Sequence, residues 1–201
     1  MEKRAHIIVP VVGKVSASER AALLRQRPVT VWLTGLSAAG KSTIAVELEK
    51  RLIEAARPCY LLDGDNIRAG ISRDLGFGPE DRHENIRRVA EVARLMNDAG
   101  IIAISAFISP YRSDRSMARE VAGAERFIEV YVNAPLEVCE RRDPKGLYRK
   151  ARGGEIPEFT GISAPYEAPE APDVVLHTAE QSVEECVSRL FALVTEKTRL
   201  R

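Results

Sequence analysis

Hydrophobic positions along the chain fall into two alternating patterns. Short apolar runs, most of them rich in β-branched residues, predict buried strands at 29–34, 59–62, 101–106, 127–132 and 173–176. Apolar residues spaced three to four apart predict helices at 16–27, 41–56, 81–99, 113–124, 135–142 and 182–195. Strands that alternate with helices form a parallel sheet covered on both faces. The pattern therefore predicts a three-layer α/β fold with a five-stranded parallel sheet.

Two signals refine the boundaries of these elements. Asp81 and Glu84 have the spacing of a capping box, and Gly100 stands where a helix-terminating glycine belongs. Before the first helix, residues 1–15 form a weakly patterned arm or linker, in which the apolar run 7–12 could be an edge strand. We expect one domain over residues 16–201.

Composition and charge exclude several classes of protein. A chain of 201 residues with 45% hydrophobic residues suits a single globular domain, and its 13 Gly and 11 Pro exclude collagen-like and low-complexity chains. The formal charge of +1 gives no overall field that would attract nucleic acid or an acidic membrane. The longest uncharged stretches, 28–40 and 99–111, are too short to span a bilayer as helices.

Targeting signals and cysteine usage indicate a cytoplasmic protein. The first 30 residues lack the order of a signal peptide, because charged residues precede only a short apolar run broken by Pro10. The three cysteines, Cys59, Cys139 and Cys186, are an odd number and contain no C-x-x-C pair. Free thiols in a reducing compartment are the expected state.

A glycine-rich loop follows the first predicted strand. Residues 35–43 match the pattern G-x-x-x-x-G-K-[ST]. Gly35 and Gly40 allow a tight turn whose N–H groups face phosphate oxygens at the positive end of a helix. Lys41 can reach the terminal phosphates, and the Ser42 hydroxyl can ligate Mg²⁺. An ordinary strand–helix turn is the alternative, but the motif in this context indicates a nucleoside triphosphate and leaves the acceptor open.

Candidate acceptor residues follow the second and third predicted strands, because ligands bind beyond the carboxyl ends of parallel strands. Asp63 could orient or deprotonate an acceptor hydroxyl, provided that its strand neighbours the first one. Asp65 or Asn66 could instead only cap the next turn. Ser109 could contact a ligand, be phosphorylated or cap the following helix.

Other candidates lie in loops and in a basic segment. Arg68 and Arg82 suit anionic oxygens through their planar guanidinium groups. Phe77, in a glycine-flanked loop, could cover an aromatic ligand or plug the core. Residues 141–152 carry six Lys or Arg against one Asp, and a Gly- and Pro-rich segment follows. A solvated helix face is the alternative, but this sequence is typical of a kinase lid, at about 144–172, that neutralises charge and excludes water.

The order and spacing of seven motifs along the chain resemble those of the motif set of adenylyl-sulfate kinases. The similarity covers roughly residue 17 to the C-terminus. The motifs are Gly35–Thr43, Asp63–Arg68, Leu75–Phe77, Asp81–Asn85, Phe107–Arg112, Asp143–Tyr148 and Phe159–Ile162. One phosphate loop is generic, whereas seven ordered motifs are specific. The resemblance implies a P-loop nucleoside triphosphate hydrolase-like fold. It also implies an enzyme of sulfate assimilation, which uses Mg-ATP to phosphorylate the 3′-hydroxyl of adenosine 5′-phosphosulfate (APS), giving 3′-phosphoadenosine 5′-phosphosulfate (PAPS) and ADP.

The same resemblance implies the site residues. ATP would contact Gly35, Leu36, Ser37, Ala38, Ala39, Gly40, Lys41, Ser42, Thr43 and, at its base, Arg152, with Ser42 on Mg²⁺. Catalysis would involve Lys41, Asp63, Ser109 and Lys145. APS would contact Asp63, Asp65, Asn66, Arg68, Phe77, Arg82, Asn85, Ile108, Ser109, Lys145, Gly146, Leu147, Phe159 and Thr160.

Individual roles follow from the same match. Phe77 and Phe159 would sandwich the adenine of APS, while Arg68, Arg82 and Asn85 would take its phosphosulfate side. Lys145 would approach the phosphates from the lid. Ser109 matches the serine that the family assigns as a phosphoserine intermediate, although in-line transfer requires only positioning and charge stabilisation. The resemblance also implies a homodimer.

Three features depart from the family pattern. Ala38 replaces the more usual glycine at the fourth position of the loop, which is harmless unless its φ is positive. Ser163 and Ala164 follow Gly161-Ile162 where the family often has an acidic residue. The arm before Ser16 has no counterpart, and its length would suit the junction of a larger sulfate-activating protein.

Two other functions remain open from the residues. Another small-molecule or nucleoside monophosphate kinase would use the same loop and lid with a different acceptor pocket. A nucleotide-binding switch without transfer activity is the second alternative, although the sequence has no N-K-x-D segment of the kind GTPases use to read their base.

Overall fold

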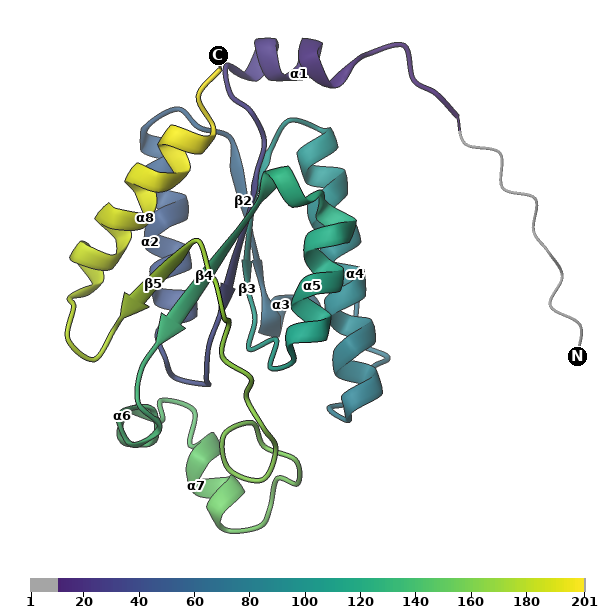
Figure 1. Ribbon diagram of the computed structural model, residues 1–201. Coiled ribbons are helices and arrows are strands. Elements are labelled where there is room, and N and C mark those ends of the chain that lie inside the picture. The colour runs from purple at the N-terminus through teal and green to yellow at the C-terminus, as the bar shows by residue number, and fades with distance from the viewer. Residues whose placement is uncertain (1–10, 201) are drawn as a thin grey trace, which may run out of the picture.

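Five parallel strands form the centre of the structure, a computed structural model that describes residues 11–200 (Figure 1). The strands are β1 (Thr30–Thr34), β2 (Cys59–Asp63), β3 (Ile102–Ala106), β4 (Phe127–Asn133) and β5 (Val174–His177). They lie in the order β2-β3-β1-β4-β5, with every neighbouring pair parallel. The sheet and its strand count are as predicted, and each strand lies within one residue of its expected range.

Helices cover both faces of this sheet. In chain order they are α1 (Ala17–Leu24), α2 (Lys41–Glu54), α3 (Gly64–Ala69), α4 (Pro79–Asp98), α5 (Arg112–Ala122), the 3₁₀ turn η1 (Ala124–Arg126), α6 (Leu136–Arg142), α7 (Leu147–Arg152) and α8 (Val183–Lys197). Figure 1 shows α2 and α8 together on one face and α4 and α5 together on the other. This is the predicted three-layer arrangement.

The central strand β1 supplies both hydrophobic cores. Its side chains alternate between the faces of the sheet, so Val31 and Leu33 pack beneath α2 and α8, whereas Trp32 packs beneath α4 and α5. The Trp32 ring stacks between Phe107, at 5.8 Å, and Phe127, at 5.6 Å between ring centroids. Both faces are buried, which explains why β1 reads as a continuous apolar run.

The prediction for the start of α4 was wrong. The helix begins at Pro79 after Gly78, two residues before Asp81, and Gly78 provides no side-chain cap. Proline suits the first helical position because its fixed φ is helical and its missing N–H would have no partner there. The Glu84 carboxylate pairs with Arg87 and Arg88 instead of closing a capping box, and these contacts lower its pKa to about 2.

Other boundaries were missed or lie outside the described residues. The helix α4 does end as expected, with Gly100 at φ +89° just after it. The short helices α3 and α7 were not predicted as elements. The possible edge strand at 7–12 lies mostly outside the described residues, and Val11 and Val12 are exposed without regular structure.

Candidate functional site

The loop 35–43 connects β1 to α2 at the carboxyl end of the sheet. It passes so close to β4 that a Cβ atom at Gly35 would lie 2.3 Å from the Val132 carbonyl oxygen, so only glycine fits there. The buried Lys41 amine donates hydrogen bonds to the carbonyls of Gly35, at 2.9 Å, and Leu36, at 2.7 Å. The loop therefore closes around the amine of its own lysine.

Burial changes the acidity of Lys41. Removal of the ammonium group from water lowers the pKa of Lys41 from its ordinary value to about 8. The nearby Asp63 and Asp65 carboxylates oppose this shift and favour the charged form. A negatively charged ligand in the loop would favour that form further.

The outer side of the loop is held by three residues for which the sequence predicted no individual contact. The Tyr148 hydroxyl donates to the Ser37 carbonyl at 3.0 Å, and the Thr178 hydroxyl donates to the Ala39 carbonyl at 2.7 Å. Arg142 donates to the Thr178 carbonyl at 2.5 Å. One signal could have identified Tyr148, because an aromatic residue within a strongly basic segment is expected to be buried.

The departure from the family pattern at Ala38 has a structural consequence. Ala38 adopts a φ of +58°, in the left-handed region that its methyl group disfavours. The condition under which alanine is harmless is therefore not met. The glycine more usual at this position would adopt the same conformation without strain.

Replacement of Ala38 by glycine is expected to raise the free energy of unfolding by up to about 1 kcal/mol, because relief of left-handed strain exceeds the added entropy of the unfolded chain. Urea denaturation measures the change. Ala39→Gly is the matched control, since Ala39 is fully buried and is not among the residues with a positive φ, and it should lower stability. A lower stability of both variants would contradict the strain at Ala38.

Ser42 joins the loop to the end of β2. Its hydroxyl donates to a carboxylate oxygen of Asp63 at 2.7 Å, and the other oxygen of Asp63 accepts the backbone N–H of Asp65 at 3.1 Å, which caps α3. The condition set for Asp63, that its strand β2 neighbours β1, is not met, since β3 lies between them. The side chains meet because Ser42 lies in the first turn of α2 rather than on the strand.

This pair of oxygen ligands fits Mg²⁺. Magnesium prefers hard oxygen ligands and retains several waters or phosphate oxygens in its coordination shell. The protein therefore needs to supply only one or two oxygen atoms. Within residues 11–200 there is no cluster of three or more His, Cys, Asp or Glu side chains that could hold a metal by itself. The donor set at Ser42 and Asp63 is therefore suited to a metal that arrives with a nucleotide.

Arg82 connects the two segments that carry the candidate phenylalanines. Its guanidinium donates to the Phe77 carbonyl at 2.6 Å, to the Glu158 carbonyl at 2.6 Å and to the Thr160 hydroxyl at 2.5 Å. The segments around Phe77 and Phe159 therefore lie on either side of one arginine.

The two phenylalanines differ in their surroundings. Phe77 is 67% exposed, with the Arg68 guanidinium 4.3 Å from the centre of its ring, so it does not plug the core. Phe159 is buried and meets the Tyr148 ring edge to face, with 5.0 Å between centroids. Tyr148 thus touches the phosphate loop through its hydroxyl and Phe159 through its ring.

The lid contributes a contact across the site. Lys145 forms an ion pair with Asp65, in the first turn of α3. Gly146 directly precedes α7 and Leu147 begins it, while Arg152 ends it and pairs with Glu140 at 2.6 Å. Lys145 therefore lies beside α3, while Arg152 lies at the other end of the helix.

The remaining candidates lie within α3, within α4 and just after β3. Asn66 is exposed on α3, and Asn85 is buried on α4 with its carbonyl oxygen unpaired among the described residues. Ile108 is half-buried, and Ser109 is buried with its hydroxyl accepting the Trp32 indole N–H at 3.1 Å. Ser109 does not cap α5, because the residue before that helix is Tyr111.

One further structural property bears on the setting of the site. In the part of the chain from residue 11 to 200, no helix has both the length and the apolar character needed to cross a membrane.

Comparison with known proteins identifies the family. The family model described as adenylylsulphate kinase matches residues 27–177. The adenylyl-sulfate kinase of Staphylococcus haemolyticus is 55% identical over 92% of this chain and 93% of its own length, and that of Saccharomyces cerevisiae is 57% identical over 89% and 90%. The structure of the Mycobacterium tuberculosis APS kinase CysC in complex with AMPPNP and APS is 46% identical, with a TM-score of 0.81 over 84% of this chain and 98% of that one. This chain therefore belongs to the adenylylsulphate kinase family.

Proposed function

We propose that this protein transfers the γ-phosphoryl group of ATP to the 3′-hydroxyl of APS, giving PAPS and ADP, in sulfate assimilation. The observation that carries the proposal is the hydrogen bond between Ser42 of the phosphate loop and Asp63 on the acceptor side. It brings a phosphate-binding group and a candidate base into direct contact, as transfer between two bound substrates requires. Family membership supports the identity of both substrates.

The donor half holds the triphosphate. The backbone N–H groups of residues 35–43 and the positive end of α2 would bind phosphate oxygens, and Lys41 would exchange its two carbonyl contacts for the terminal phosphates. Ser42 would ligate Mg²⁺, which would supply neutralisation of the charge on the transferred group. Lys145, released from Asp65, would add a positive charge from the lid. Arg152 would approach the ATP base.

The acceptor half holds APS. Phe77 and Phe159 would clamp its adenine, while Arg68, Arg82 and Asn85 would bind its phosphosulfate. The remaining contacts would come from Asp65, Asn66, Ile108, Ser109, Gly146, Leu147 and Thr160. Because Arg82 already ties the Phe77 segment to the Glu158–Thr160 segment, it would shape the clamp as well as bind charge.

The phosphoryl group would pass directly between the substrates. Asp63 would accept the proton of the 3′-hydroxyl while the oxygen bonds to the γ-phosphorus and ADP leaves. The burial of Ser109 and the hydrogen bond from Trp32 to its hydroxyl support a role in the pocket wall rather than as a phosphoserine intermediate.

An acceptor panel tests this function. ADP release is measured with ATP, Mg²⁺ and APS, AMP, other nucleoside monophosphates or shikimate. We expect release with APS and little with AMP, which lacks the sulfate that the arginines would bind. A preference for another acceptor would indicate a different kinase, and nucleotide binding without acceptor-dependent release would indicate a switch.

Nucleotide affinity is expected to fall above pH 8. The free protein loses the Lys41 proton near its pKa of about 8, and the bound phosphates favour the charged form, so binding above that pH must take up a proton. Affinity should decrease by up to about tenfold per pH unit from pH 8 to 9.5. Calorimetry in buffers of different ionisation enthalpy measures the proton uptake. The Lys41→Ala variant is the control, with weaker binding that does not vary over this range; a wild-type affinity equally independent of pH would contradict the assignment.

The assembly and setting are proposed on family grounds. We propose a cytoplasmic homodimer with an arm over residues 1–15, a kinase domain over 16–201 and a lid at about 144–172. The APS kinase from Thiobacillus denitrificans, which is 31% identical with a TM-score of 0.67 over 92% of this chain and 32% of that one, is described as hexameric. Light scattering of the purified chain would measure the state directly.

A further inference from the structure

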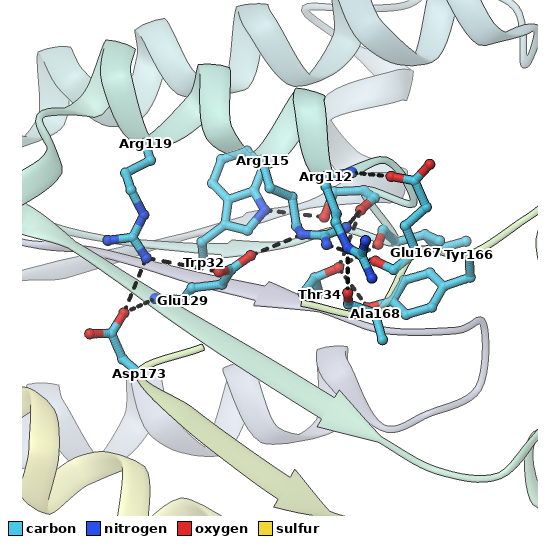
Figure 2. A network of polar contacts seen from close by, with 12 residues as sticks. Trp32, Thr34, Arg112, Arg115, Arg119, Glu129, Tyr166, Glu167, Ala168 and Asp173 are labelled. Carbon is cyan, nitrogen blue, oxygen red and sulfur yellow. Dashed lines mark hydrogen bonds and ion pairs between the residues drawn. The ribbon is translucent and has the colours of Figure 1, made fainter. Parts of the chain in front are cut away.

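Three arginines on one face of α5 hold the chain that returns from the lid to β5. Arg112, Arg115 and Arg119 stand three and four residues apart, which places them on one side of the helix (Figure 2). Arg112 donates from its backbone to the Glu167 carboxylate and from its side chain to the Ala168 carbonyl. Arg119 reaches Asp173 at 3.3 Å. We call residues 166–168 the return segment; Asp173, the partner of Arg119, lies beyond it.

Arg115 is the most enclosed of the three. Its side chain is 3% exposed, and its guanidinium donates to three acceptors from different parts of the fold. These are the Glu129 carboxylate of β4 at 2.9 Å, the Ser109 carbonyl at 2.7 Å and the Glu167 carbonyl at 2.7 Å. A buried charge that is paired and hydrogen-bonded through each of its three nitrogens holds its partners in one geometry.

The Ser109 backbone needs such support. Its φ of +37° is unusual for a residue with a side chain, and such conformations persist only where the surroundings fix them. Arg115 binds the Ser109 carbonyl, and Trp32 binds its hydroxyl. Ile108, the residue before it, is fixed through its carbonyl by the Thr34 hydroxyl at 2.7 Å.

The return segment is attached to the same place. The Thr34 and Tyr166 hydroxyls are 3.0 Å apart, and the Glu167 N–H donates to the Pro110 carbonyl at 2.8 Å. Figure 2 shows Arg115 between Glu129 on one side and Tyr166 and Glu167 on the other. Residues Ile108 and Ser109, which follow β3, and the C-terminal part of the proposed lid are therefore joined by one set of hydrogen bonds, with Arg115 at its centre.

We propose that Arg115, oriented by Glu129, is a positioning residue for the acceptor substrate. It acts through the Ser109 backbone and the return segment, and it has no contact with the phosphate loop among the hydrogen bonds and ion pairs of residues 11–200. Its loss should therefore weaken the use of the acceptor and leave the use of ATP nearly unchanged. This inference rests on the proposed function, because the acceptor is taken to be APS.

Arg115→Lys tests the proposal, with steady-state kinetics for each substrate in turn. Lysine keeps the charge but cannot reach three acceptors in one plane, so the KM for APS should rise about tenfold or more, and the KM for ATP should change less than about twofold. Glu129→Gln, which keeps the oxygen acceptor and removes its charge, should give a smaller change in the same direction. If Arg115→Lys does not fold, Glu129→Gln alone tests the proposal through the same two KM values.

Arg119→Lys is the matched control. It is the same substitution on the same helix and also borders Glu129, at 3.9 Å, but it contacts neither Ser109 nor the return segment. Its KM for APS should equal that of the wild type. Equal changes in both KM values for Arg115→Lys and Glu129→Gln, or a loss of thermal stability with unchanged kinetics, would overturn the positioning role. Absence of APS-dependent ADP release in the wild type would instead overturn the proposed function, and the inference with it.

Discussion

The Lys41→Ala variant is expected to lose measurable turnover, a decrease of about 10³-fold or more, because the group that would neutralise the terminal phosphates is removed from a buried site. The structure gives the physical reason. The amine lies inside the loop, held by the Gly35 and Leu36 carbonyls, where its charge interacts with a ligand through little intervening water. Coupled measurement of ADP release with APS and ATP gives the result.

The exposed Lys50 provides the control for this experiment. It lies on the same helix, so Lys50→Ala removes the same charge outside the loop and should leave kcat and both KM values unchanged. Full activity of Lys41→Ala would refute the assignment of the phosphate loop. Thermal unfolding of both variants separates loss of chemistry from loss of fold.

Asp63→Asn is expected to keep ATP binding within a few-fold while kcat falls by about 10²- to 10⁴-fold, the range typical of a lost general base. The asparagine side-chain oxygen can still accept the Asp65 N–H, so the cap of α3 is retained. What disappears is the negative charge beside Ser42 and the capacity to accept a proton. Single-turnover kinetics measure the rate of phosphoryl transfer, and calorimetric titration measures the affinity for ATP.

A neighbouring carboxylate, Asp65, shows whether the effect of Asp63→Asn comes from the position of that side chain or from the loss of any negative charge in this region. Asp65→Asn makes the same change two residues further along the chain, on a side chain that pairs with Lys145 and forms no hydrogen bond with Ser42. Its loss of kcat should be no more than about tenfold, because the change affects the exposed ion pair with Lys145 and one proposed contact to APS, but no group that accepts the proton. Equal losses in the two variants would mean that Asp63 has no special role, and unchanged catalysis in Asp63→Asn would remove it from the mechanism.

The sequence predicts the layers of this fold well because burial on both faces of a parallel sheet leaves a strong local pattern. Each strand is a short apolar run, and the phosphate loop is contiguous in the chain. The start of α4 was misjudged for a local reason, since the proline and glycine at 78–79 define the helix better than the acidic pair at 81 and 84. The short helices α3 and α7 have too few residues to produce a periodic signal.

Contacts between distant segments could not be predicted from the sequence. The Arg115 guanidinium gathers partners from 109, 129 and 167, and nothing in its local sequence distinguishes it from Arg112 or Arg119, which are more exposed. The link from Tyr148 to Ser37 spans 111 positions. Such pairs depend on the order of the strands, which the sequence does not state.

The setting of Arg68 and Arg82 has a consequence for the response of the protein to salts. Their hydrogen-bond acceptors are carbonyl and hydroxyl oxygens, and neither forms a salt bridge with an acidic side chain within residues 11–200. Burial, and after it the positive charge of the nearby Arg82, lowers the pKa of the Arg68 guanidinium. Binding of a multivalent anion would relieve this repulsion between like charges. Inorganic sulfate alone should therefore raise the melting temperature, and high concentrations of monovalent salt should weaken that effect by screening.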